Sequence, residues 1–233
     1  MLTPDETAAV LLSLKVAFWS VMISLPLGYA AAWMLARWHF PGKILVDAFI
    51  HLPLVLPPVV IGFMLLATFG RNGAVGGWLY DWFGITFAFR WTGAALASAI
   101  MGFPLMVRAI RLSLTNIDPR LEIAARTLGA SPLRAFFTIT LPLTLPGIIA
   151  GATLAFARSL GEFGATITFV SNIPGETQTL PLAIYNLTQM PGSDAAAWKL
   201  SLVAVLLSVL ALALSEWLVT RSNTASASSR SRA

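Results

Sequence analysis

Five long apolar segments constrain this chain more than any other feature of its sequence. A helix rises about 1.5 Å per residue, so about 20 apolar residues are needed to cross a hydrocarbon layer of roughly 30 Å. Only 11% of the residues are charged, whereas soluble domains carry about 25%. We therefore predict an all-α polytopic membrane protein with five spans. The predicted spans cover about 8–36, 45–69, 92–114, 137–159 and 199–219.

The second span contains three prolines, Pro53, Pro57 and Pro58. Proline removes a backbone donor and clashes with the preceding turn, so such a span needs neighbours that satisfy the freed carbonyls. Two interpretations stay open: a kinked helix, or a broken helix that lines a pathway.

Residues 160–198 are moderately apolar but rich in glycine and proline, and no run among them reaches about 20 residues. A short re-entrant element around 163–173 would count as a sixth membrane element, and the sequence leaves this open. The start of the chain, 1–7, lacks the basic region of a signal peptide, so we expect the first span to be retained. The polar tail 220–233 has the composition of a disordered segment.

Basic residues predict the orientation. Arg71 and Arg90 fall on one side of a five-span arrangement, with Lys15, Arg158 and Lys199 near its boundary. The positive-inside rule makes the more basic, opposite side cytoplasmic. We therefore predict an outside N-terminus and a cytoplasmic C-terminus. The basic residues on the cytoplasmic side are Arg37, Lys43, Arg108, Arg111, Arg120, Arg126, Arg134, Arg221, Arg230 and Arg232.

The polar segment 116–136 separates the third and fourth spans and contains unusually clear helix signals. Asp118 followed by proline predicts a helix N-terminus, and Glu122 in the first turn suits the helix dipole. Gly129 predicts the end of that helix, because glycine readily adopts the left-handed conformation. Ser131, again followed by proline, starts a second helix. We predict two short helices joined by a sharp turn on the cytoplasmic side.

Catalytic and metal-binding patterns are missing from the sequence. It has no phosphate-binding Gly-x4-Gly-Lys-Ser/Thr loop, no nucleophile or zinc-protease motif and no cysteine. Its two histidines, one of them His51 in the second span, are not accompanied by a carboxylate cluster, so we predict no metal site. The chain is therefore not expected to be an enzyme or to carry a cofactor, and energy for any driven transport must come from another subunit.

Arg158 and Glu162 lie four residues apart near the outer end of the fourth span, and two interpretations stay open. One is an ion pair on a helix face. The other is an anion pathway, in which Arg158 attracts an oxyanion and nearby hydroxyl and amide groups bind it weakly. The groups that would line this pathway are Arg158, Glu162, Thr166, Thr168, Ser171 and Asn172.

The polar segment resembles the EAA loop of permease subunits of ABC importers. Ala124-Ala125, three residues, Gly129, nine residues and then Ile139-x-Leu141-Pro142 match the spacing of that motif. One departure is visible: Ile123 stands where the motif has glutamate, and Glu122 precedes it. The resemblance implies that the segment docks into a groove on a cytoplasmic ATPase subunit. The residues it assigns to coupling are Glu122, Ala124, Ala125, Gly129, Ile139, Leu141 and Pro142.

A second stretch, Leu160-Gly161-Glu162-Phe163-Gly164-Ala165, resembles oxyanion importers of the sulfate and molybdate group, and residues 166–177 look more like the molybdate branch. The resemblance covers about 8–217 and implies a type I ABC importer transmembrane domain in the bacterial inner (plasma) membrane. It further implies a homodimer, two ATPase subunits that use ATP and Mg²⁺, a periplasmic or extracellular molybdate-binding protein, and alternating access. Nucleic acid has no role in it.

Alternative functions stay open from the residues alone. Within the same family the substrate could be sulfate, thiosulfate or tungstate. A non-transporting membrane anchor or assembly protein would not need proline-broken, polar elements within its spans. A passive channel would not need a cytoplasmic docking helix.

Overall fold

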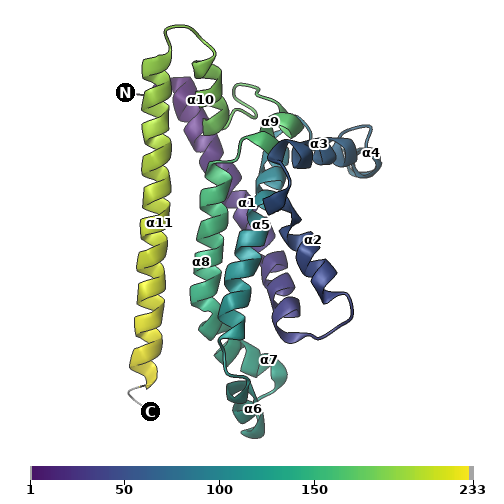
Figure 1. Cartoon of the computed structure of the whole chain (residues 1–233), viewed down its shortest axis with the longest axis vertical. Coiled ribbons are helices and arrows are strands. Elements are labelled where there is room, and N and C mark those ends of the chain that lie inside the picture. The colour runs from purple at the N-terminus through teal and green to yellow at the C-terminus, as the bar shows by residue number, and fades with distance from the viewer. Residues whose placement is uncertain (1, 231–233) are drawn as a thin grey trace.

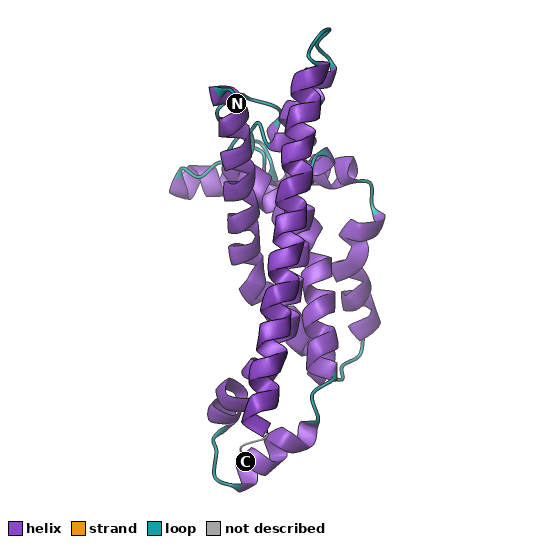
Figure 2. Cartoon of the chain, turned by 90° about the vertical axis from the view of Figure 1, so that its left-hand side faces the viewer, coloured by secondary structure: helices purple, strands orange, loops and turns teal. Residues whose placement is uncertain are grey.

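The computed structural model describes residues 2–230, and for residues 215, 218 and 221–230 it describes the backbone alone. The described part is helical, without strands, and forms an elongated bundle (Figures 1 and 2). Its elements are α1 (Pro4–Arg37), α2 (Lys43–Val55), α3 (Pro58–Phe69), α4 (Ala74–Phe83), α5 (Trp91–Thr115), α6 (Pro119–Thr127), α7 (Pro132–Ala135), the π-helical turn η1 (Phe136–Thr140), α8 (Leu141–Leu160), α9 (Gly164–Val170), α10 (Leu180–Thr188) and α11 (Asp194–Arg230).

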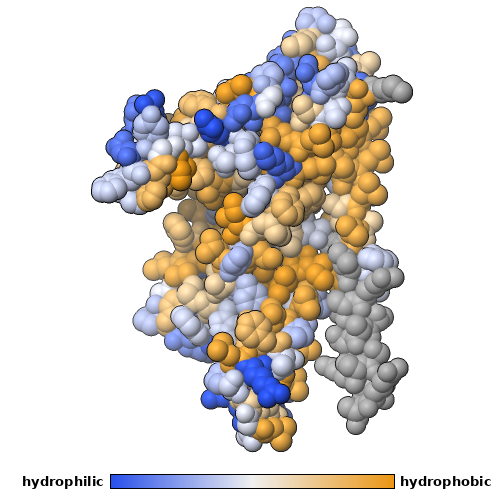
Figure 3. Space-filling model, turned by 180° about the vertical axis from the view of Figure 1, so that it is seen from behind, coloured by the Kyte–Doolittle hydropathy of each residue, from blue (hydrophilic) through white to orange (hydrophobic). Residues whose placement is uncertain are grey.

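Long apolar helices form the body of the bundle. Within the described residues, four helical stretches are long and apolar enough to cross a membrane: Pro4–Arg37, Trp91–Thr115, Pro132–Leu160 and Asp194–Leu214. They correspond to the first, third, fourth and fifth predicted spans. Figure 3 shows apolar residues over the middle of the molecule and polar residues gathered towards its two ends, as a bilayer requires.

The second predicted span is not one straight helix. Its residues form α2 and α3, which are bent by 111° at a short break. The break falls at Leu56, whose extended backbone is the conformation favoured before proline, and at the two prolines that follow. The helix is therefore broken, whereas its place along a pathway stays a prediction. In Figure 1, α2 follows the bundle and α3 turns across it, with α4 beyond.

The region between α8 and α11 adds no crossing to the described part of the chain. It forms α9, with seven residues, and α10, with nine, and both are far too short to span a bilayer. Figure 1 places them at the end of the bundle where α8 stops and α11 begins. The element considered around 163–173 is thus a short helix at one end of the bundle.

The last helix is longer than predicted. It starts at Asp194 and continues to Arg230, so most of the segment predicted to be disordered is helical in the structure. The end of that predicted tail, 231–233, lies outside the described residues.

Small residues allow α5 to occupy the centre of the bundle between α1 and α8. A Cβ added to Gly147 of α8 would lie 2.3 Å from Cβ of Ser113, and one added to Gly102 would lie 3.2 Å from Cβ of Ala155. Close backbone approach at small residues is the usual basis of helix association in lipid, because the hydrophobic effect does not drive helices together there.

The same principle holds α9 against α3. A Cβ added to Gly62 would lie 2.6 Å from the carbonyl oxygen of Ala165, and one added to Gly164 would lie 2.8 Å from Cβ of Pro58. The two short helices therefore approach closely at both glycines, and buried Phe169 packs them against the core that α5 forms.

Candidate coupling segment and polar cluster

The helix signals of the polar segment are all present in the structure. Asp118 Oδ1 accepts a 2.9 Å hydrogen bond from the Arg120 amide, and α6 then runs to Thr127. Gly129 has a φ of +90°, in the left-handed region, and makes the turn. Ser131 Oγ accepts a 3.3 Å bond from the Arg134 amide and starts α7. These elements project from the end of the bundle opposite α9 and α10 (Figure 1).

A π-helical turn connects α7 to α8. The Leu141 amide donates to the Phe136 carbonyl, five residues back instead of four. Pro142 follows immediately and has no amide with which to continue the ordinary ladder, so a widened turn at this place accommodates it. The Leu-Pro end of the motif thus coincides with the end of the π-helical turn, where α8 begins.

Apolar side chains protrude from this otherwise polar end. Leu128 is 89% exposed and Leu133 is 72% exposed, and both flank the turn at Gly129. Ile123 on α6 and Phe137 on η1 are exposed as well. At the lower tip in Figure 3, apolar and strongly polar residues lie side by side. A helical tip that exposes large apolar residues among arginines has the character of a contact surface for another protein.

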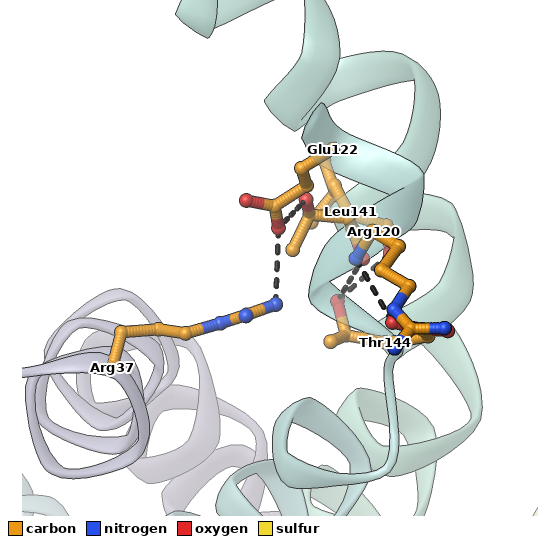
Figure 4. Close-up of polar contacts among 7 residues, drawn as sticks. Arg37, Arg120, Glu122, Leu141 and Thr144 are labelled. Carbon is orange, nitrogen blue, oxygen red and sulfur yellow. Dashed lines mark hydrogen bonds and ion pairs between the residues drawn. The ribbon is translucent and has the colours of Figure 1, made fainter. Parts of the chain in front are cut away.

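Glu122 points inward, away from that surface. Its Oε1 accepts a 3.0 Å charge-assisted bond from Arg37 Nη2 at the end of α1 and a 2.6 Å bond from the Thr140 hydroxyl in η1 (Figure 4). The carboxylate therefore joins α6 to the nearby η1 and to α1, whose Arg37 lies 85 residues away in the sequence.

Six of the seven residues predicted for coupling fall into two groups. Ala124 and Gly129 are exposed at the tip, with Ala125 half-buried behind them. Ile139, Leu141 and Pro142 instead belong to the π-turn and the start of α8, where the first two are half-buried. Glu122 belongs with neither, since its carboxylate is engaged inside the chain.

Sequence reasoning missed Leu128, Leu133, Arg37 and Thr140 as parts of this site. The two leucines could have been found as the apolar residues of an otherwise polar segment. Arg37 was counted only for topology, and its partner lies 85 residues away, so spacing carries no signal for the pair.

At the opposite end of the bundle, Arg158 and Glu162 form the ion pair that their spacing predicts. Arg158 Nη1 lies 2.6 Å from Glu162 Oε2. The Glu162 side chain is only 1% exposed, and its Oε1 also accepts a 2.8 Å bond from the Ala165 amide at the start of α9. Arg158 is 28% exposed, so it lies between this buried carboxylate and the surface.

The other residues predicted for an anion pathway lie on α9 or directly after its C-terminal end. Thr166 is buried, and the Thr168 hydroxyl donates to the Gly164 carbonyl of its own helix. Ser171 ends α9 with φ +63° and ψ −164°, a conformation that residues other than glycine rarely adopt. Asn172 donates to the Leu182 carbonyl at 3.5 Å. The structure thus gathers them around one short helix.

Comparison with solved structures defines the fold. The transmembrane chain of a bacterial ABC transporter that imports the acidic polysaccharide alginate matches with a TM-score of 0.74 and 17% identity, over 94% of this chain and 80% of that one. The MetNI methionine ABC transporter, in inward-facing conformations, matches with a TM-score of 0.69 and 18% identity, over 92% and 94%. The fold is that of an ABC importer transmembrane domain.

Sequence comparison gives the family. Residues 24–224 match the model for binding-protein-dependent transport system inner membrane components, and the chain belongs to this family. It is 63% identical to the molybdenum transport system permease protein ModB of Escherichia coli (strain K12), over 94% of this chain and 95% of that protein. The ModB protein of Haemophilus influenzae is 62% identical over 93% and 94%. The sulfate permease CysT of Escherichia coli (strain K12) is 39% identical over 78% and 65%.

Proposed function

We propose that this chain is the permease subunit through which an ATP-driven importer moves molybdate across the inner membrane. The observation that carries the coupling part of the proposal is the exposed helical tip, with Leu128 and Leu133 unburied among arginines. Molybdate is the inferred cargo because two relatives that are 63% and 62% identical over their aligned residues are named as molybdenum permeases. The more distant sulfate permease matches over less of the chain.

The proposed complex holds two copies of this chain, two ATPase subunits and an external binding protein. ATP and Mg²⁺ would bind the ATPase subunits, so this chain is a transport subunit and not an enzyme. An alginate importer of the same fold has been solved with a periplasmic protein that carries alginate pentasaccharide, which supports the arrangement. ATP-driven closure of the ATPase dimer would bring the two helical tips together and open the pathway outward.

The proposed orientation puts the N-terminus outside and the C-terminus in the cytoplasm. Arg120, Arg126 and Arg134 all lie on the projecting helical tip, so the positive-inside rule assigns that end to the cytoplasm. The ATPase would then meet α6 and α7 on the side where ATP is available.

Different residues would contribute to coupling in different ways. The small Ala124 and Ala125 would allow α6 to approach a groove closely, and Gly129 would set the angle of the tip. Ile139, Leu141 and Pro142 would connect the tip to α8 through the π-turn. The cluster at the opposite end would lie on the outer half of the anion path, where the Arg158 side chain is paired with Glu162 and still 28% exposed.

Docking can be tested at Leu128, because its side chain is 89% exposed and its loss should not disturb the fold. Leu128→Asp should abolish co-purification of the ATPase subunit with the co-expressed permease. Ile44→Asp is the matched control, since Ile44 is 84% exposed at the start of α2, outside the helical tip. Full ATPase recovery with Leu128→Asp would contradict the docking role.

The substrate can be tested by reconstituting the complex in liposomes and measuring ATP-dependent uptake of labelled molybdate. Unlabelled tungstate, which has nearly the same size and charge, should compete, whereas sulfate should compete weakly. Preferential sulfate uptake would move the assignment to the sulfate branch. ATP-independent flux would indicate a channel, and the absence of any flux would indicate an anchor or assembly protein.

A further inference from the structure

A closed ring of contacts includes the C-terminal end of α1. Arg37 donates to Glu122 at 3.0 Å, Glu122 accepts from Thr140 at 2.6 Å, and Thr140 ends the same π-turn that Phe136 begins. The Phe136 ring packs edge-on against Trp33 at 5.4 Å between centroids, and the Arg37 guanidinium lies 5.6 Å from the centre of the Trp33 ring. The ring thus returns to α1.

The polar contacts of this ring are largely shielded from water. The Arg37 and Glu122 side chains are 19% and 27% exposed, so water screens their attraction less than at an open surface. Thr140 is completely buried, and its hydroxyl finds an acceptor in Glu122. In Figure 4 the Arg37 side chain reaches across from α1 to meet the carboxylate.

Glu122 is therefore placed to act inside the permease. One of its oxygens is shared by two donors from different elements, whereas Leu128 and Leu133 on the same tip face outward. The π-turn is a place where the backbone departs from regular α-helical bonding, and such turns occur frequently at functional sites. Movement of α6 would be transmitted to α1 through Arg37 and to the N-terminal end of α8 through Thr140.

We propose that Arg37, Glu122 and Thr140 are positioning residues that transmit movement of the docking helix α6 to α1 and to the π-turn at the base of α8. This role rests on the proposed function, because it presupposes an ATPase that moves α6. It assigns Glu122 to transmission within the permease and not to docking on the partner.

Two threonines of the π-turn provide a matched test. Thr140→Val removes the hydroxyl that bonds Glu122 at nearly constant volume. Thr138→Val makes the same change at an exposed residue whose hydroxyl bonds only the Arg134 carbonyl of its own helical stretch. In the reconstituted complex, Thr140→Val should keep the ATPase subunit and its basal activity. It should lose stimulation by the molybdate-loaded binding protein by about tenfold, a usual size for the loss of a coupling interaction. Thr138→Val should behave as wild type.

A charge exchange gives a second, independent readout. Arg37→Glu and Glu122→Arg should each uncouple hydrolysis from uptake, and the double variant should recover a substantial part of the uptake. The Thr140 hydroxyl can then accept from the new arginine, since a hydroxyl is both donor and acceptor. Recovery should be incomplete, because an arginine in the first turn of α6 opposes the helix dipole.

The outcomes separate this proposal from the proposed function. If wild-type permease retains no ATPase subunit, the proposed function fails. If wild type is coupled but Thr140→Val matches Thr138→Val, or the charge exchange recovers nothing, the linkage is overturned. Loss of the ATPase subunit in Glu122→Gln would also overturn it, because Glu122 would then be a docking residue.

Discussion

Replacing Gly129 tests whether the angle of the helical tip sets the coupling. Its φ of +90° lies in the left-handed region, and a Cβ added there would meet nothing within 4 Å in the described part of the chain. Within this chain, any effect therefore comes from backbone strain and not from a clash. For residues other than glycine, the left-handed conformation costs about 1–2 kcal/mol. Asparagine tolerates it best, and β-branched residues tolerate it worst.

These costs predict a graded series. Asn should stay near wild type, Ala should lower the population of the native turn about fivefold at about 1 kcal/mol, and Val about thirtyfold at about 2 kcal/mol. The assay is molybdate taken up per ATP hydrolysed in proteoliposomes, with the amount of bound ATPase subunit as a check. The matched control is Gly161→Ala, which also adds a Cβ into open space but at a φ of −95°, where alanine is unstrained. Equal coupling in the Asn, Ala and Val variants would refute the reasoning.

The remaining predictions concern packing, the outer ion pair and orientation. Gly62→Ala should lower thermal stability by about 1–3 kcal/mol, because its Cβ would lie 2.6 Å from a backbone oxygen of α9; unchanged melting would contradict that contact. Arg158→Gln should reduce both uptake and stability, because it leaves buried Glu162 unpaired. Adding Glu162→Gln should restore stability alone, and full uptake in this double variant would remove Arg158 from the anion path. Ser131→Cys introduces the only thiol into a chain without cysteine, so an impermeant maleimide should label it in inverted vesicles and not in intact cells. Labelling from outside would reverse the proposed orientation.

Features set by neighbouring residues could be predicted from the sequence. The N-caps at Asp118 and Ser131 and the turn at Gly129 depend on interactions within three residues, and all are present. The long apolar runs were equally reliable, because helix length and hydrophobicity decide whether a segment can cross a bilayer. The four straight spans therefore agree with the structure to within a few residues, except that the last helix extends further.

Features that depend on distant contacts could not be predicted in this way. Three prolines left a kinked and a broken second span open, and the 111° bend between α2 and α3 follows from contacts such as that of α3 with α9. The sequence groups Glu122 with the docking residues because it lies one residue before the glutamate position of the motif. Its inward direction follows from Arg37, which no local pattern connects to it. Arg158 and Glu162 were close enough in sequence for their pairing to be foreseen as one of two alternatives.

The glycine contact between α3 and α9 has a mechanical consequence. A Cβ added at Gly62 would lie 2.6 Å from the Ala165 carbonyl oxygen and 2.8 Å from Cβ of Thr168, so the two helices already touch through backbone and side chain alike. Ile61 and Leu65 of α3 also share one buried core with Phe169 of α9. Interiors packed at this density have few voids and pass displacement from one element to the next. We therefore expect α3 and α9 to travel together as one rigid block, and not to slide past one another.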